Sequence, residues 1–68
     1  MITCYDISMK RTVLINPRYV VSMVSMEDSV GKAVEIHLMG QPFMIKVKEN
    51  AREVEEIKEF FKNYKEED

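Results

Sequence analysis

The sequence is poor in the residues that build metal centres, disulfides and phosphate-binding loops. Its 68 residues include one cysteine, one histidine and two glycines. A single cysteine excludes an internal disulfide, and Cys4 with His37 falls short of the four ligands that a structural zinc site requires. Gly31 and Gly40 stand too far apart to form a phosphate-binding loop. We therefore expect no metal, no cofactor and no disulfide in this chain.

Long apolar runs are also missing. No run approaches the ~20 residues of a membrane-spanning helix. The first residues, MITCYDISMKR, lack the basic start, the apolar stretch and the small-residue cleavage site of a secretory signal. A lone thiol without a disulfide framework is typical of a reducing compartment. These features predict a cytoplasmic protein without a membrane span.

The length and the charge distribution indicate one small domain with two unlike parts. A chain of 68 residues buries only about 60% of the surface that its unfolded form exposes, so it must gain stability from a dense core or from oligomerisation. Residues 1–48 carry six basic and four acidic groups, a net charge of +2, whereas residues 49–68 carry eight acidic and four basic groups, a net charge of −4. We predict a single domain over residues 1–68, with a sheet in 1–48, a helix in 50–66 and a frayed acidic tail in 66–68.

The clearest strand pattern is AVEIHLMGQPFMIKVK, residues 33–48. Apolar and polar residues alternate on both sides of Gly40, which is the period of two half-buried strands joined by a hairpin turn. The hairpin register places Glu35 opposite Lys46, as a cross-strand ion pair, and His37 opposite Met44. Because Pro42 has no N–H to close a two-residue turn, a wider loop with the same pairing is the alternative. The row expected to face the core consists of Val34, Ile36, Leu38, Phe43, Ile45 and Val47.

Three earlier strands and a closing helix complete the predicted fold. Residues 2–7, 12–16 and 19–26 are rich in β-branched and aromatic residues, with a bend at Asn16-Pro17 and a loop at 27–32. Asn50 and Glu53 have the spacing of a helix N-cap and its capping box. The apolar stripe of that helix consists of Val54, Ile57, Phe61 and Tyr64. The pattern predicts an α+β fold: an antiparallel β-meander of about five strands, open or curled into a small barrel, with one C-terminal amphipathic helix packed on a face.

Two stretches resemble a known family. TVLINPRYVVSM (residues 12–23) and GKAVEIHLMGQPFMIKVKENAREVEEIKEFF (residues 31–61) resemble the small flagellar and swarming-motility protein family of FlbD type. Its members look like a hydrophobic-Asn-Pro step, a strand, a short loop, a two-stranded hairpin and a closing helix. The family usually has Asn-Gly where Met9-Lys10 stands here, and a shorter loop than 27–32. The resemblance implies a small accessory protein and not an enzyme.

The residues themselves predict no catalytic site. Nucleophilic catalysis by Cys4 would need a base, and His37 is the one candidate. Most isolated cysteines are buried apolar residues, and a lone histidine on a strand is most simply an exposed residue that packs on Met44. We therefore expect a protein that is not an enzyme.

The sheet face opposite the helix is the better candidate for function. It carries apolar residues that no predicted element covers, and contiguous exposed apolar patches mark interaction sites. Closure of the sheet into a small barrel would bury them instead. We predict a module that acts by association with itself or with a partner protein. Its candidate interface consists of Val20, Met23, Val24, Met39, Met44 and His37.

A sheet that binds nucleic acid is the second hypothesis. In this case Tyr5 or Tyr19 would stack on bases, and basic side chains of the sheet would contact phosphates. The charge of residues 1–48 is mild for this purpose, since a clearly basic stripe is expected. The candidate contacts are Lys10, Arg11, Arg18, Lys46 and Lys48.

Overall fold

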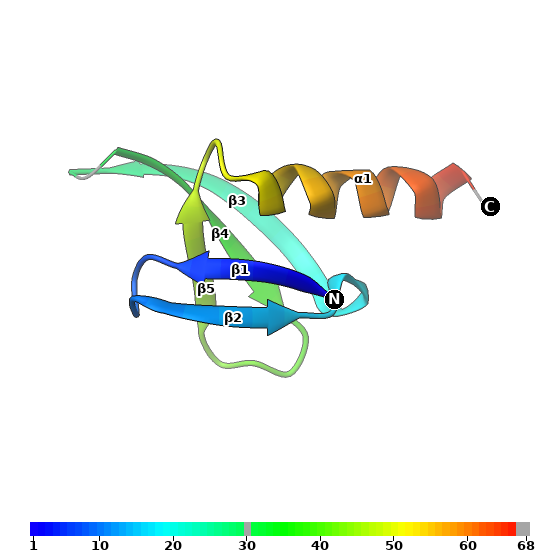
Figure 1. Ribbon diagram of the computed structural model, residues 1–68, viewed down its shortest axis with the longest axis horizontal. Helices are drawn as coiled ribbons and strands as arrows, with labels where there is room; N and C mark the ends of the chain where they lie inside the picture. Colours follow the sequence, from blue (N-terminus) through cyan, green and yellow to red (C-terminus); the bar gives the residue numbers. More distant parts are fainter. Residues whose placement is uncertain (30, 67–68) are drawn as a thin grey trace.

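The strands form two antiparallel sheets with one helix beside them. The computed structural model describes residues 1–29 and 31–66, and in these residues it confirms the α+β class (Figure 1). β1 and β2 form a two-stranded sheet, and β3, β4 and β5 form a three-stranded one. The elements are β1 (Ile2–Asp6), β2 (Arg11–Ile15), the 3-10 turn η1 (Pro17–Tyr19), β3 (Val20–Asp28), β4 (Gly31–Leu38), β5 (Met44–Lys48) and α1 (Arg52–Glu66).

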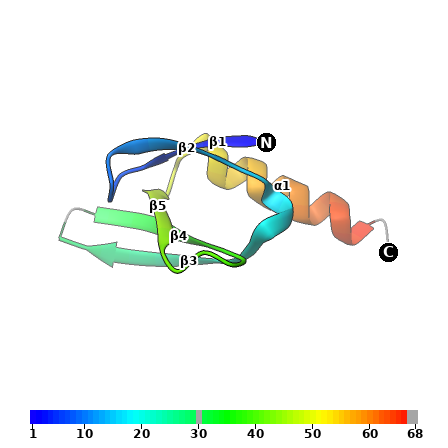
Figure 2. The ribbon, with the colours of Figure 1, turned by 90° about the horizontal axis from the view of Figure 1, so that it is seen from below.

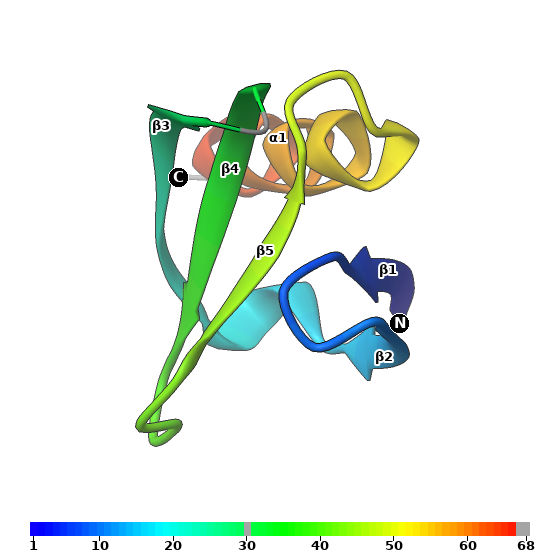
Figure 3. The same ribbon diagram turned by 90° about the vertical axis from the view of Figure 1, so that its left-hand side faces the viewer.

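The two sheets lie against each other without closing into a barrel in the part of the chain described. Figure 2 shows the β1–β2 hairpin across from β3 and β4, and Figure 3 shows it beside the β5 edge. The backbone N–H of Ile7 donates to the carbonyl of Lys46 at 2.8 Å, which joins the end of β1 to β5. The apolar core therefore lies between the sheets, and α1 covers one end of it.

A buried carboxylate holds this junction together. Asp6 is fully buried at the end of β1. Its Oδ1 accepts from the backbone N–H of Ser8 at 3.0 Å, of Met9 at 3.4 Å and of Lys46 at 3.4 Å. Its Oδ2 has no hydrogen-bond partner among the described residues and lies 3.8 Å from Nε of Arg11. One side chain thus shapes the turn after β1 and ties that turn to β5.

The register predicted for the second hairpin is confirmed over the length of β5. Glu35 pairs with Lys46 and His37 with Met44, while Val34 and Ile36 pair with Val47 and Ile45 and are buried with them. The ladder ends there.

The prediction was wrong for Phe43, the residue before β5. Its side chain is 48% exposed, and its ring lies 5.4 Å below the guanidinium carbon of Arg11. Pro42 precedes it and cannot donate a ladder hydrogen bond, so the loop is wider than two residues and Phe43 falls outside the strand. Leu38, its expected partner, is the last residue of β4 and is half-buried.

A β-bulge at the start of β3 changes which residues face the core. Val20 pairs with Leu38 and Ser22 with His37, so that Val21 is an extra residue between two successive pairs. The bulge places Val20 and Met23 on the same inner side, although an odd spacing puts two residues of a regular strand on opposite faces. Val20 is buried, and Met23 packs against the core. The prediction that these two side chains form part of an outer interface was therefore wrong.

The connection between β3 and β4 is shorter than predicted. Residues 27–32 were expected to form a loop. Instead Glu27 pairs with Lys32 and Asp28 with Gly31, so β3 extends to Asp28 and β4 begins at Gly31. Gly31 has φ +137°, a conformation that a residue without Cβ adopts readily, and its N–H donates to Oδ1 of Asp28 at 3.2 Å. Val30 lies outside the described residues.

The helix covers the core as predicted but begins differently. α1 starts at Arg52, and Asn50 lies in the preceding turn, so the predicted capping box is wrong. The side chain of Glu53 points toward β1 and not back to the start of the helix, because its Oε2 accepts a hydrogen bond from the backbone N–H of Tyr5 at 3.0 Å. Within the stripe, Val54 and Ile57 are buried, and Phe61 is half-buried against the core. The side chain of Tyr64 and the tail residues 67–68 lie outside the described residues.

Candidate interaction surface

The two residues considered for nucleophilic chemistry are not brought together. Cys4 is fully buried in the core, whereas His37 is half-buried on the opposite face of the three-stranded sheet. Burial, with the nearby carboxylates of Glu53 and Glu56, raises the pKa of the Cys4 thiol to about 11. In residues 1–29 and 31–66, no group of three or more His, Cys, Asp or Glu side chains is placed to hold a metal ion.

The raised pKa of Cys4 predicts an unreactive thiol. An increase from 9.0 to about 11 lowers the thiolate fraction at pH 8 about a hundredfold, and the thiolate is the reactive form. We expect iodoacetamide to alkylate the native chain at least about a hundredfold more slowly than the chain in urea. Native and unfolded rates within tenfold of each other would contradict this placement of the thiol.

Because the folded state retains the thiol proton of Cys4 to a higher pH than the unfolded state, the free energy of unfolding should fall as pH rises from about 9 to about 11.

The outer face of the three-stranded sheet carries a small apolar patch. Ser22, His37 and Met44 form one row across the strands, and Val24 follows in the next row. Val21, Val24 and Met44 are 64%, 45% and 40% exposed. We call Val21, Val24, His37 and Met44 the outer patch. Three of the six predicted interface residues, Val24, His37 and Met44, belong to it.

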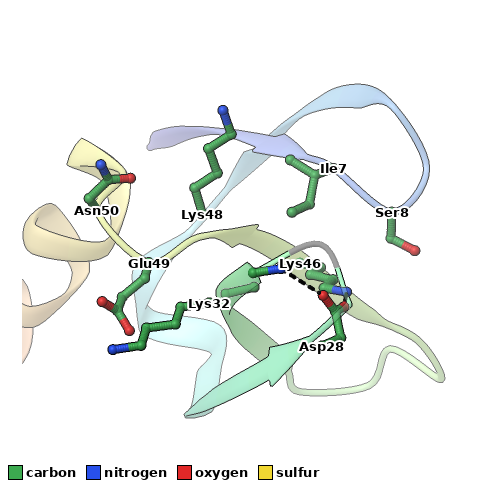
Figure 4. A pocket seen from close by; sticks show the side chains of 10 residues that line it. Ile7, Ser8, Asp28, Lys32, Lys46, Lys48, Glu49 and Asn50 are labelled. Atoms are coloured by element: carbon green, nitrogen blue, oxygen red, sulfur yellow. Dashed lines mark hydrogen bonds and ion pairs between the residues drawn. The ribbon is translucent and has the colours of Figure 1, made fainter.

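Farther along, the outer face carries charged side chains, and Lys46 is already in an ion pair. Nζ of Lys46 forms an ion pair with Oδ2 of Asp28, and no ion pair joins Lys46 to Glu35 among the described residues, so that predicted pair is wrong. Figure 4 shows this ion pair beside a hollow of about 410 Å³, and it shows Lys32, Lys46 and Lys48 pointing in different directions. The three ammonium groups therefore do not converge on a common site.

The basic residues of the nucleic-acid hypothesis are spread over the molecule. Lys10 lies in the turn before β2, Arg11 is the first residue of that strand, and Arg18 lies in η1 beyond its other end. Lys46 is engaged with Asp28 on the outer face. Tyr5 in β1 and Tyr19 in η1 are each about half exposed, but they stand in different elements. The five predicted contacts do not form one stripe.

The free edge of β3 is a feature that the sequence pattern did not reveal. β4 lies between β3 and β5, so one side of β3 has no neighbouring strand in the described chain (Figure 3). The backbone N–H and C=O of Lys46 face β1, so those of its partner Glu35 face Val24 in β3, and Val24 bonds back to Glu35. The residues on either side of Val24, and every second residue after them, therefore turn their backbone N–H and C=O toward the free edge. These residues are Met23, Ser25 and Glu27.

A second free edge lines an apolar groove. The groove holds about 580 Å³ between β2 and the tip of the β4–β5 hairpin, and every residue from Arg11 to Asn16 lines it. Half of the ten most exposed large apolar side chains of the described residues gather here. They are Met1, Leu14, Tyr19, Met39 and Phe43. Met39, which was predicted in the outer interface, belongs to this groove.

Comparisons with known proteins do not assign the chain to a family. No protein-family model matches it, and no curated protein and no solved structure matches it significantly. The resemblance to the flagellar and swarming-motility family therefore stays a prediction. The described part of the chain contains no helix with the length and apolar character of a membrane span.

Proposed function

We propose that this chain is a small accessory module of the cytoplasm that acts by protein association and not by catalysis, with a second copy as its first partner. The observation that carries the proposal is the free edge of β3 beside the outer patch. An open strand edge is a template for pairing with another chain. Val24, an exposed member of that patch in β3, would pack beside the second copy in such a pair and lose part of its contact with water.

The central residues of β3, 22–26, lack the devices that usually block edge pairing. Natural edge strands often contain lysine or proline, or are very short, and these features prevent association. β3 is nine residues long, VVSMVSMED, and it contains neither lysine nor proline. Its bulge lies at one end, between Val20 and Ser22, and leaves the outward groups of residues 23–27 in a regular strand. Six consecutive residues, 22–27, are thus free to pair.

Antiparallel pairing of two β3 strands is compatible with their charges. A two-fold axis at Ser25 would place Met23 opposite Glu27 of the second copy, and Val24 opposite Met26 of the second copy. The acidic residues Glu27 and Asp28 then face neutral residues and not their own images. This register joins the outer faces of the copies into one six-stranded sheet, with the two outer patches on the same side.

The substitution Ser25→Pro tests the proposal. The Ser25 N–H faces away from β4, so proline removes a donor of the free edge and leaves the β3–β4 ladder intact. We expect sedimentation equilibrium to give twice the 8.0 kDa chain mass for the wild type and 8.0 kDa for the variant, with the same far-UV circular dichroism. Thr12→Pro, an equivalent edge proline in β2, should leave the dimer intact.

Two outcomes would contradict the proposal. A wild-type chain that stays at 8.0 kDa up to millimolar concentration would exclude self-association as its working state. A Ser25→Pro variant that is folded and still dimeric would show that the copies meet through another surface.

A further inference from the structure

We propose that the groove between β2 and the β4–β5 hairpin binds an extended, acidic and apolar peptide segment of a partner protein, which adds to the β1–β2 sheet as a third strand. This groove lies at a different strand edge from the pairing of two copies, so a negative result for peptide binding leaves self-association untouched, and the reverse. Strand addition to a free edge is a common mode of peptide recognition.

Hydrogen bonding within the fold determines which groups of β2 face the groove. The N–H of Tyr5 in β1 donates to Glu53, and that of Ile7, just after β1, donates to Lys46, so alternate residues along this segment turn their backbone groups away from β2. Tyr5 and Thr3 pair with Thr12 and Leu14 across the β1–β2 ladder. Because paired residues that do not bond each other both face outward, Thr12 and Leu14 present their N–H and C=O groups to the free edge.

The groove has a second wall that supplies apolar contacts. Tyr19, Met39 and Phe43 line the side opposite β2, and all three side chains are 48% to 66% exposed. An extended strand is the backbone that satisfies the outward groups of Thr12 and Leu14 while pointing every second side chain to one wall. A segment of about five residues spans the edge from residue 11 to residue 16 at roughly 3.3 Å per residue.

Charge specifies the chemistry of the segment further. Among the described residues that line the groove, Arg11 alone has a charged side chain, and none is a carboxylate. Its side chain is 46% exposed above Phe43, and its Nε lies 3.8 Å from the buried carboxylate of Asp6. A guanidinium has five N–H donors, so Arg11 has donors left for a carboxylate of the segment. An acidic residue is therefore expected at the end of the segment that lies beside Phe43.

The first step of the test is selection from a phage-displayed library of random decapeptides on the immobilised wild-type chain. We expect enrichment of sequences with bulky apolar residues at alternate positions, an Asp or Glu at one end and no central proline. Enrichment of basic sequences, or no enrichment above an uncoated surface, would overturn the proposal.

The second step measures the best selected peptide, labelled with fluorescein, by fluorescence anisotropy. Thr12→Pro removes an outward N–H without touching the β1–β2 ladder and should weaken binding about tenfold or more. Met39→Glu is a second test that does not depend on how well the proline variant folds. It changes an exposed side chain of the opposite wall and adds a negative charge that repels the acidic peptide, so it should also weaken binding. Ser25→Pro is the matched control and should bind like the wild type. Equal affinity in all folded variants would place the peptide elsewhere and overturn the proposal.

Discussion

Replacing Asp6 with alanine should cost about 3 kcal/mol of unfolding free energy, a large part of the stability of a chain this short. The Asp6 carboxylate accepts three backbone hydrogen bonds from two separate segments, the turn at Ser8 and Met9 and the strand at Lys46. Hydrogen bonds to a charged group contribute about 1.5 to 3 kcal/mol each, and a buried donor left without a partner costs about 1 to 3 kcal/mol. A domain of this length has in total roughly 3 to 10 kcal/mol.

Urea unfolding followed by far-UV circular dichroism measures this loss, and Asp6→Asn provides the graded control. An asparagine keeps a carbonyl oxygen at the position of Oδ1 but carries no charge toward Arg11, so it should lose about 1 kcal/mol, less than alanine. If Asp6→Ala unfolds at the same urea concentration as the wild type, the carboxylate does not hold the turn and β5 together.

The importance of Asp6 could not be read from the sequence, and the reason is physical. An aspartate before Ser8 and Met9 predicts a local turn, because its side chain accepts from the N–H groups that follow it. Its third donor, Lys46, is 40 residues away. A partner at that distance depends on how the two sheets meet, which no local pattern records.

The β4–β5 register shows the opposite case. Alternation with period two, interrupted at Gly40, specified every pair from Val34 with Val47 to His37 with Met44, because a slip by one residue would expose the whole core row. The prediction was wrong only at its end, where Pro42 cannot donate a ladder hydrogen bond and Phe43 lies outside the strand. Strong two-sided patterning is therefore enough to specify a register, but not the residue at which pairing stops.

The β3 bulge explains why the candidate interface was only partly predicted. One extra residue, Val21, reverses the alternation between Val20 and Met23 without any change in composition. A strand of valines and methionines looks apolar in either phase, so the sequence offered no preference for the face that holds Val24. The free edges of β2 and β3 were missed for a related reason, since edges depend on the order of strands in the sheets and not on any strand alone.

Replacing Ile57 with alanine should cost about 2 to 5 kcal/mol, the usual range for truncating a fully buried isoleucine. Ile57 is fully buried on the first turns of α1 and belongs to the core cluster that also contains Ile2 of β1 and Ile36 of β4. Because this one cluster contains residues of α1 and of both sheets, Ile57 helps to join the helix, the β1–β2 hairpin and the three-stranded sheet around one core. A surface ion pair contributes only roughly 0 to 1 kcal/mol to stability, so the buried Ile57 side chain should contribute more than any charged side chain on the helix.

The neighbouring residue Lys58 supplies the control for this prediction. Its side chain is 61% exposed, and its Nζ lies 4.0 Å from a carboxylate oxygen of Glu55, so Lys58→Ala should change the unfolding free energy by less than about 0.5 kcal/mol. The two urea midpoints, measured by circular dichroism at equal chain concentration to hold any dimer population fixed, should therefore differ widely. Equal midpoints would mean that α1 does not cover the core, and the fold would then have to be held by the two sheets alone.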